Sequence, residues 1–452
     1  MSIRLPRDFI WGAASAAPQI EGYSEADGGG ASVWDVYAHT PGRIDFGENG
    51  DTACGSYYRY AEDIALVKGL GADVYRFSTS WARCDPEGNG RWNEAGFDYY
   101  ERVADECLRQ GVRPVVTLYH WELPQAAEER GGWISPDTAE RFADFAGRMA
   151  GRLRGRVGLY FTLNEPQCTV TMSYGDGSHA PGRTLPLSGQ FGVLVQQQRA
   201  HGLAMRAVKA ADPDAAVGIV STGRHCFPDS ESREDIAAAR LALFDTAGGD
   251  PMFTHSWLLD PIFTGRYPED CAGTELERLV SRLTPGELET ILCVPDCVGY
   301  NMYHGRRVRA VPGGYEYVPE YSGFPRSSLG WPITPEVLDW SVRFLCERYR
   351  VPAFIAENGV SCADVVGVDG RVRDPQRIDF LTRYLAALSC AIENGADVRG
   401  WLHWSLTDNF EWSNGYYPRF GLVYTDYRDF KRIPKDSYYW LREQIAKTKS
   451  GG

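Results

Sequence analysis

Short apolar runs alternate with amphipathic segments along nearly the whole chain. Eight runs are rich in β-branched and aromatic residues, as is typical of buried strands; they are residues 9–14, 74–78, 114–120, 159–165, 217–221, 298–303, 353–357 and 399–405. Between them, apolar side chains recur at helical spacing in residues 98–110, 138–152, 191–211, 335–350 and 374–394. Alternating strands and helices predict a parallel sheet, and eight repeats predict its closure. We therefore expect an α/β fold, a single (β/α)8 TIM barrel over residues 1–452.

Long inserts interrupt this pattern at four places, in residues 21–50, 173–189, 303–329 and 409–434. Each insert follows a strand candidate, so in a barrel it would lie on the face formed by the carboxyl ends of the strands. Loops on that face commonly carry binding and catalytic groups. We expect these four loops to surround a deep pocket.

Charge and cysteine content narrow the classes of partner. The net charge is −13 and the isoelectric point about 5.2, which disfavours nucleic acid or an anionic membrane and favours a small-molecule ligand. The 11 cysteines follow no metal-binding pattern, so we expect no metal, no cofactor and reduced thiols. The chain also lacks the pattern of a signal peptide or a membrane span, and we expect a cytoplasmic protein. The sequence is silent on the oligomeric state.

Two segments carry the strongest chemical signal. They are Thr-Leu-Asn-Glu-Pro at 162–166 and Phe-Ile-Ala-Glu-Asn-Gly at 354–359, and each ends a strand candidate in a glutamate beside an asparagine. A carboxylate at that point is poorly placed for core packing but well placed for catalysis on a barrel. Facing one cleft, Glu165 and Glu357 could cleave a glycosidic bond, one by donating a proton and one by attacking or stabilising the sugar carbon.

Other strand ends carry polar or aromatic side chains suited to a sugar pocket. These residues are Gln19, His120, Trp121, Asn164, Asn301, Tyr303, Trp404, Glu411 and Trp412. A structural role would be favoured for any one of them alone, but their recurrence at one level of the barrel indicates a binding site. We expect Asn164 to reach the sugar 2-hydroxyl and Tyr303 to hold the charge of Glu357. The proline after Glu165 predicts an extended backbone at Glu165.

Several long motifs resemble those of glycoside hydrolase family 1, the β-glucosidase family. They are Phe-Ile-Trp-Gly-Ala-Ala at 9–14, Gln-Ile-Glu-Gly at 19–22, Thr-Leu-Tyr-His-Trp-Glu-Leu-Pro at 117–124, Gly-Tyr-Asn-Met-Tyr at 299–303 and Trp-Ser-Leu-Thr-Asp-Asn-Phe-Glu-Trp at 404–412, together with the two glutamate segments. The resemblance runs from about residue 9 to residue 440.

The resemblance implies a retaining β-glycosidase, most similar to β-glucosidases, that removes terminal unphosphorylated β-D-glucosyl residues by double displacement. Galactosyl and fucosyl residues are further candidates. By position, Glu165 is similar to the family's acid/base and Glu357 to its nucleophile, while the residues at the other strand ends match those that hold the sugar. Trp331 matches a tryptophan that stacks on the leaving group. Retention would place the two carboxyl groups roughly 5–5.5 Å apart.

Two branches of the family fit less well. Thioglucosidases have glutamine where Glu165 stands, and phospho-glycosidases have a small residue where Glu411 stands. Pro18, Met302 and Ala356 depart from the usual family residues beside the pocket. A transglycosidase acting through the same residues stays open, and a non-catalytic sugar-binding barrel is disfavoured because both glutamates are present.

Overall fold

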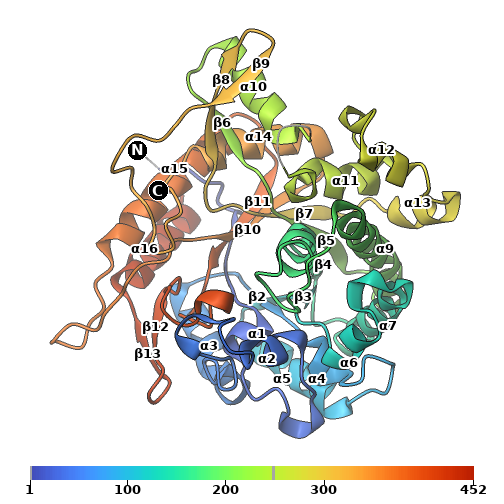
Figure 1. Ribbon diagram of the computed structural model, residues 1–452. Coiled ribbons are helices and arrows are strands. Elements are labelled where there is room, and N and C mark those ends of the chain that lie inside the picture. The colour runs from blue at the N-terminus through green and yellow to red at the C-terminus, as the bar shows by residue number, and fades with distance from the viewer. Residues whose placement is uncertain (1–2, 247–249, 452) are drawn as a thin grey trace.

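Eight parallel strands form a closed barrel inside a ring of helices in the computed structural model, which describes residues 3–246 and 250–451 (Figure 1). The barrel strands are β1 (Ile10–Ala14), β2 (Val74–Ser78), β3 (Arg113–Tyr119), β4 (Leu159–Asn164), β5 (Ala216–Ser221), β7 (Cys297–Asn301), β10 (Ala353–Asn358) and β11 (Val398–Trp404). Their order around the barrel is β1-β11-β10-β7-β5-β4-β3-β2. The predicted TIM barrel is confirmed, and each predicted strand lies within two residues of an observed one.

The strands are apolar along their length because both of their faces are buried. One set of side chains, including Val74, Val115 and Phe161, packs inside the barrel, and a second set, including Trp11 and Tyr75, packs under the helices. Burying each such side chain contributes about 1.5–3 kcal/mol. This double burial explains why the strands could be found from short apolar runs.

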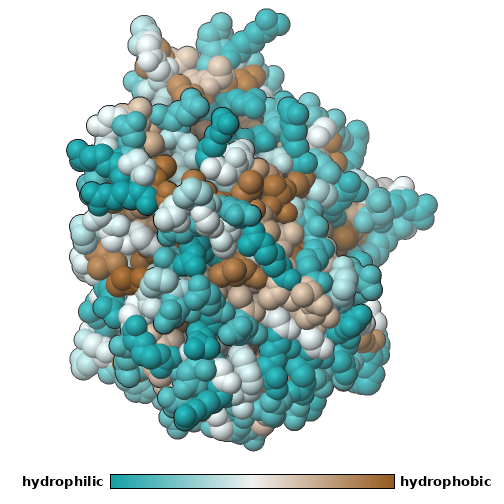
Figure 2. Space-filling view, turned by 90° about the vertical axis from the view of Figure 1, so that its right-hand side faces the viewer, coloured by the Kyte–Doolittle hydropathy of each residue, from teal (hydrophilic) through white to brown (hydrophobic). Residues whose placement is uncertain are grey.

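The outer layer contains the five predicted helices, three of them beginning two to four residues before their predicted starts. They are α5 (Glu94–Gln110), α7 (Pro136–Arg152), α9 (Leu187–Ala211), α14 (Val337–Tyr349) and α15 (Pro375–Glu393). The other α-helices of at least four residues are α1 (Ala17–Ile20), α2 (Val33–Ala38), α3 (Ser56–Leu70), α4 (Trp81–Cys84), α6 (Gln125–Glu129), α10 (Arg233–Phe244), α11 (His255–Thr264), α12 (Glu275–Val280), α13 (Pro285–Ile291) and α16 (Asp436–Ser450). On the side of α12 and α13 the surface is mostly hydrophilic, with hydrophobic side chains in small groups (Figure 2). None of the helices within the described ranges has the length and apolar character that crossing a bilayer requires.

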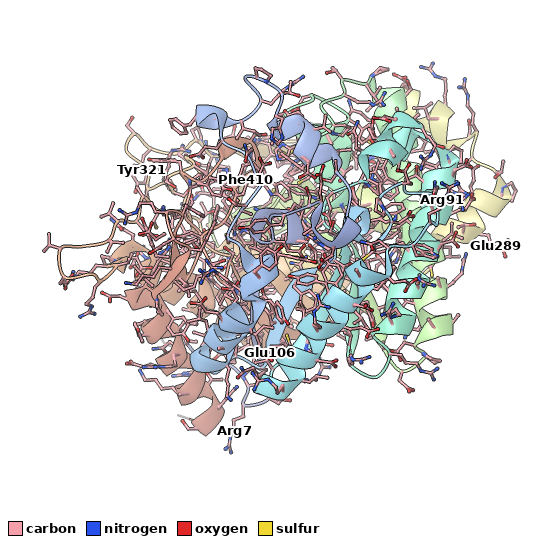
Figure 3. All side chains as sticks on the ribbon, turned by 90° about the horizontal axis from the view of Figure 1, so that it is seen from below. Arg7, Arg91, Glu106, Glu289, Tyr321 and Phe410 are labelled. Carbon is pink, nitrogen blue, oxygen red and sulfur yellow. The ribbon has the colours of Figure 1, made fainter. Side chains whose placement is uncertain are left out.

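Two of the long inserts contain strands of their own. In the insert after β7, β8 (Arg306–Val311) and β9 (Gly314–Tyr317) join β6 (Cys226–Pro228) in a small sheet outside the helix ring (Figure 1). In the insert after β11, β12 (Val423–Asp426) and β13 (Lys431–Pro434) form a hairpin. Figure 3 shows Tyr321 and Phe410 from these two inserts at one end of the barrel, and Arg7, which precedes β1, at the other.

A buried ionic cluster holds the loops that follow the last two barrel strands. The ammonium group of Lys435 lies 2.6 Å from Asp364 in the loop after β10 and 2.6 Å from Asp408 in the loop after β11. Arg377 of α15 also pairs with Asp364, at 2.7 Å. All of these side chains are almost fully buried, so each charge depends on its partners.

We predict that Lys435→Met lowers the free energy of unfolding by about 3–5 kcal/mol, because two buried carboxylates lose their shared cation. Urea denaturation followed by tryptophan fluorescence measures the loss. Lys431→Met, at an exposed position of the hairpin that directly precedes Lys435, serves as the matched control and should change the free energy of unfolding by less than about 0.5 kcal/mol. Equal stability of the two variants would contradict the role given to the cluster.

Candidate active site

A cavity of about 450 Å³ opens at the carboxyl ends of the strands. Ten of the twelve predicted site residues line it: His120, Trp121, Glu165, Asn301, Tyr303, Trp331, Glu357, Trp404, Glu411 and Trp412. The other two, Gln19 and Asn164, are fully buried directly behind this wall, where they contact Glu411 and His120 respectively. The twelve predicted site residues, which are spread over nearly 400 positions of the sequence, therefore lie together in the structure.

Glu357 stands near the end of β10 between a cation and a phenol. Nη1 of Arg76 donates a hydrogen bond to its Oε1 at 2.7 Å, and the hydroxyl of Tyr303 donates to its Oε2 at 2.7 Å. Burial raises the pKa of Glu357 above its ordinary value, while Arg76, Tyr303 and Asn301 lower it. These three donors favour the ionised form against the cost of burial. The predicted contact between Tyr303 and Glu357 is present.

Arg76 is a site residue that the sequence analysis missed. It lies in the middle of β2 and is fully buried beneath the cavity, where Nη2 also donates to Oδ1 of Asn164 at 2.7 Å. An arginine inside the apolar run Val-Tyr-Arg-Phe-Ser was the available signal, because a buried guanidinium requires a carboxylate partner. One side chain thus fixes both Glu357 and Asn164.

Glu165 follows β4 and has neutral partners only. Nδ2 of Asn301 donates to its Oε1 at 2.9 Å, and the thiol of Cys168 lies 3.5 Å from its Oε2. Burial, followed by the charge of Glu357, raises the pKa of Glu165 to about 8. The two glutamates therefore have environments that favour different protonation states, which is how paired carboxyl groups acquire separate acid and base roles.

The extended backbone predicted at Glu165 is wrong. Its dihedral angles are φ 46° and ψ 62°, in the left-handed region. The amide of Glu165 donates to Val220 of β5, and its carbonyl accepts the first hydrogen bond of the short helix α8 (Pro166–Cys168). These tertiary contacts override the local preference that the following proline imposes. Trp121 and Trp412, which also line the cavity, share a positive φ, and such strain is concentrated at functional sites.

Three buried polar atoms at the inner end of the cavity have no partner among the described residues. They are Nδ1 of His120, Oε1 of Gln19 and Oδ1 of Asn301. Burial and the nearby Arg76 lower the pKa of His120 well below its ordinary value, so the ring is neutral. Because the amide of Asn164 faces Nε2 of His120 at 3.2 Å, donation to Nε2 leaves the ring proton on Nδ1. Buried polar atoms without partners require explanation, and a polar ligand supplies one.

Glu411 lies at the same inner end, 3.4 Å from Nε2 of Gln19. Burial and the charges of Glu357 and Glu165 raise the pKa of Glu411 to about 8. Among the described residues that line the cavity there are three glutamates and no lysine or arginine. The cavity therefore suits a neutral polyol and disfavours an anion.

Aromatic rings surround this polar floor. The ring of His120 stacks near Trp404 and Trp412, at centroid distances of 5.7 and 5.9 Å. Trp331 lies at the outer end, 5.2 Å from the ring of Tyr303. Flat rings on the walls fit the apolar C–H faces of a pyranose, and hydrogen-bonding groups on the floor fit the hydroxyl groups around its edge.

The outer half of the cavity contains further residues that the motifs did not identify. They are Cys168, Met172, His179, His225, Phe253 and His304. Gln167, which follows Glu165 and Pro166 in the chain, is buried against Ser221, and Phe324 lines a neighbouring cavity. Of the three departures from the usual family residues, Met302 and Ala356 are fully buried behind the wall, and Pro18 lines a different cavity.

The described residues contain no cluster of three or more histidine, cysteine, aspartate or glutamate side chains arranged to hold a metal ion.

Comparison with known proteins identifies the family of the chain. The model of glycosyl hydrolase family 1 matches residues 1–450. β-Glucosidase A of Thermotoga maritima is 39% identical over 445 residues, which cover 98% of each chain. A bifunctional β-D-glucosidase/β-D-fucosidase of Bifidobacterium breve is 37% identical over 477 residues, which cover 99% of each chain.

Solved structures of a related enzyme are also similar to this chain over almost its whole length. The T. maritima β-glucosidase in complex with glucoimidazole superposes with a TM-score of 0.89 at 38% identity, covering 99% of this chain and 100% of that one. A second structure of that enzyme, in complex with isofagomine lactam, has a TM-score of 0.88 at 38% identity, covering 99% of this chain and 99% of that one. With a match over almost its whole length in sequence and in structure, the chain belongs to glycosyl hydrolase family 1.

Proposed function

We propose that this protein is a retaining β-glucosidase that hydrolyses unphosphorylated β-D-glucosides, with β-D-fucosides and β-D-galactosides as further substrates. The proposal rests on a difference between the two buried glutamates: Glu357 lies beside a cation, whereas Glu165 has only neutral hydrogen-bond donors as partners. Related enzymes of similar length are named β-glucosidases, and one is also named a β-fucosidase. The proposal includes the assignment of residues 1–452 to one catalytic barrel.

The reaction begins with Glu357 as the nucleophile. The Arg76 guanidinium and the Tyr303 hydroxyl keep its carboxylate ionised, and Oε2 or Oε1 attacks the anomeric carbon. Glu165, which burial keeps protonated, donates its proton to the glycosidic oxygen as that bond breaks. The products of this step are the free aglycone and a glucosyl ester of Glu357.

Formation of the ester removes the negative charge of Glu357. That charge is one cause of the raised pKa of Glu165, so the pKa of Glu165 falls in the intermediate. Glu165 is by then deprotonated, and it takes a proton from water as the water oxygen attacks the anomeric carbon. The ester bond breaks, glucose leaves with retained configuration, and both glutamates return to their starting states.

The sugar is held by the unpartnered polar atoms of the cavity floor. Nδ1–H of His120 donates to a hydroxyl, Oε1 of Gln19 and Oδ1 of Asn301 accept from hydroxyls, and Glu411 binds the hydroxyls at the far end of the ring. Relatives have been solved with sugar-like inhibitors such as glucoimidazole and isofagomine lactam, which supports a monosaccharide in this position.

A reducing compartment, the cytoplasm, is proposed as the location. All eleven cysteines are free thiols, seven of them buried, and free thiols persist where disulfides are kept reduced. Fractionation of cells that produce the full chain would test this location.

Glu357→Ala should reduce kcat on 4-nitrophenyl β-D-glucoside by about 10⁴-fold or more, because no side chain remains to form the ester. Added azide should restore part of the turnover and give α-glucosyl azide, the product of inverted configuration. Chromatography measures the turnover, and NMR of the isolated product gives its anomeric configuration. Glu347→Ala, which removes an exposed glutamate, is the control and should retain full activity. Rescue that yields the β-azide would assign the nucleophile elsewhere.

Glu165→Ala should slow the hydrolysis of glucosides with poor leaving groups by about 10²–10⁴-fold, because these require protonation. The first step with a 2,4-dinitrophenyl leaving group should change far less. In the wild type, kcat/KM for a poor leaving group should fall as the pH rises through about 8, where Glu165 loses its proton, and the variant should lack this fall. Stopped-flow kinetics over the pH range measure it, and equal slowing of both substrate classes would refute the acid assignment.

Tyr303→Phe should move the acidic limb of the kcat/KM profile to higher pH. The phenol hydrogen bond lowers the pKa of Glu357, so its removal raises that pKa, and a higher pH is needed to ionise the nucleophile. Tyr58→Phe, at an exposed position, is the matched control. An unchanged acidic limb in Tyr303→Phe would show that this contact does not set the charge of Glu357.

A further inference from the structure

A second cavity of about 520 Å³ adjoins the outer half of the active site. The chain passes directly from one cavity to the other, since His304 lines the active site and Gly305 lines the second cavity. Residues of the small sheet of β6, β8 and β9 line the second cavity, as does Tyr321, which Figure 3 places at the same end of the barrel as Phe410. We call it the outer cavity.

His304 and Trp331, which line the active site, lie close in the chain to residues of the outer cavity. The ring of His304 lies 5.5 Å from Trp331, and Arg326 pairs with Pro332, the next residue after Trp331, in an antiparallel bridge. Arg306 and Arg326, both of the outer cavity, lie close enough to contribute to the lowered pKa of His304. A molecule that stacks on Trp331 is therefore only a short distance from these two guanidinium groups.

The charge of the outer cavity opposes that of the whole protein. Three arginines, Arg306, Arg307 and Arg326, line it with one carboxylate, Glu320, which pairs with Arg326. Arg307 pairs with Asp229 at 3.6 Å and with Glu336 at 3.9 Å. Arg306 lies over the ring of Tyr317 at 4.9 Å and has no carboxylate partner among the described residues. In a chain of net charge −13, a guanidinium group without a carboxylate partner favours an anionic ligand.

Aromatic rings line the same cavity. Phe227, Tyr317, Tyr321 and Phe324 contribute to its wall, and Tyr321 is 68% exposed. Arginine beside aromatic rings binds flat conjugated acids, since the guanidinium pairs with the carboxylate and the rings contact the apolar body. The active site itself is lined by carboxyl groups and disfavours an anion in the sugar position.

We propose that the outer cavity is a binding site for the distal end of an acidic aromatic aglycone. This inference rests on the proposed β-glucosidase function and extends it to a substrate class: β-glucosides whose neutral sugar is joined to a phenolic ring with a remote carboxylate. The sugar occupies the active site, the ring passes His304 and Trp331, and the carboxylate pairs with Arg306 and Arg307.

The test compares two substrates that differ in one charge, the β-glucosides of 4-hydroxycinnamate and of its methyl ester. The methyl ester group withdraws more electron density from the phenolic ring than the carboxylate does, so the phenol of the ester substrate is the better leaving group. A preference of the enzyme for the acid must therefore come from binding. The wild type should show a kcat/KM about tenfold higher for the acid, mainly through a lower KM. The preference should shrink when the salt concentration is raised to about 0.5 M.

The double variant Arg306→Ala/Arg307→Ala should lose about tenfold in kcat/KM for the acid and less than about twofold for the ester. Arg309→Ala is the matched control, since Arg309 lies on the same strand but pairs with Glu316 of β9 outside the cavity. It should leave both substrates unchanged. The ester and 4-nitrophenyl β-D-glucoside also report whether the variants are folded.

Suppose that the wild type hydrolyses 4-nitrophenyl β-D-glucoside but shows no preference for the acid, or that the preference survives in the double variant. Either result would overturn the outer site and leave the proposed β-glucosidase function intact. Failure of the wild type to hydrolyse any of the three β-glucosides would overturn both.

Discussion

The ion pair between Arg76 and Glu357 is the interaction on which the site depends. It is buried beneath the cavity floor, where a carboxylate without a cation would take up a proton. The same guanidinium binds Asn164, and Asn164 in turn contacts His120 and Asn301. Asn301 then donates to Glu165. A single positive charge from β2 thus orders side chains of β4 and β7 and of the loop after β3, and the barrel is what brings these strands together.

The charge difference between the two glutamates follows from this arrangement. Arg76 is bonded to Glu357, whereas Glu165 has an amide and a thiol as partners. The negative charge that Arg76 maintains on Glu357 also helps to keep the proton on Glu165. The two roles are therefore coupled. Formation of the ester removes the charge of Glu357 that keeps Glu165 protonated, and hydrolysis of the ester restores that charge.

The barrel and most of the site could be predicted because their signals are local. Strands buried on both faces are apolar throughout, and Glu165 and Glu357 stand out because each ends such a run. Arg76 could not be assigned, since its partner Glu357 is 281 positions away. The backbone at Glu165 was predicted wrongly for a similar reason: the contact with Val220 that fixes it is invisible to a rule about adjacent residues. His225 and Phe253 reach the outer wall from loops without any motif.

Trapping of the covalent intermediate tests the central claim most directly. In 2,4-dinitrophenyl 2-deoxy-2-fluoro-β-D-glucoside the fluorine slows both steps, while the leaving group accelerates the first, so the ester accumulates. Peptide mapping by mass spectrometry then locates the sugar. The account predicts one label per chain, on Glu357 and in the peptide that contains residues 353–358. A label on Glu165 or Glu411, or turnover of a good β-glucoside without any covalent label, would contradict it.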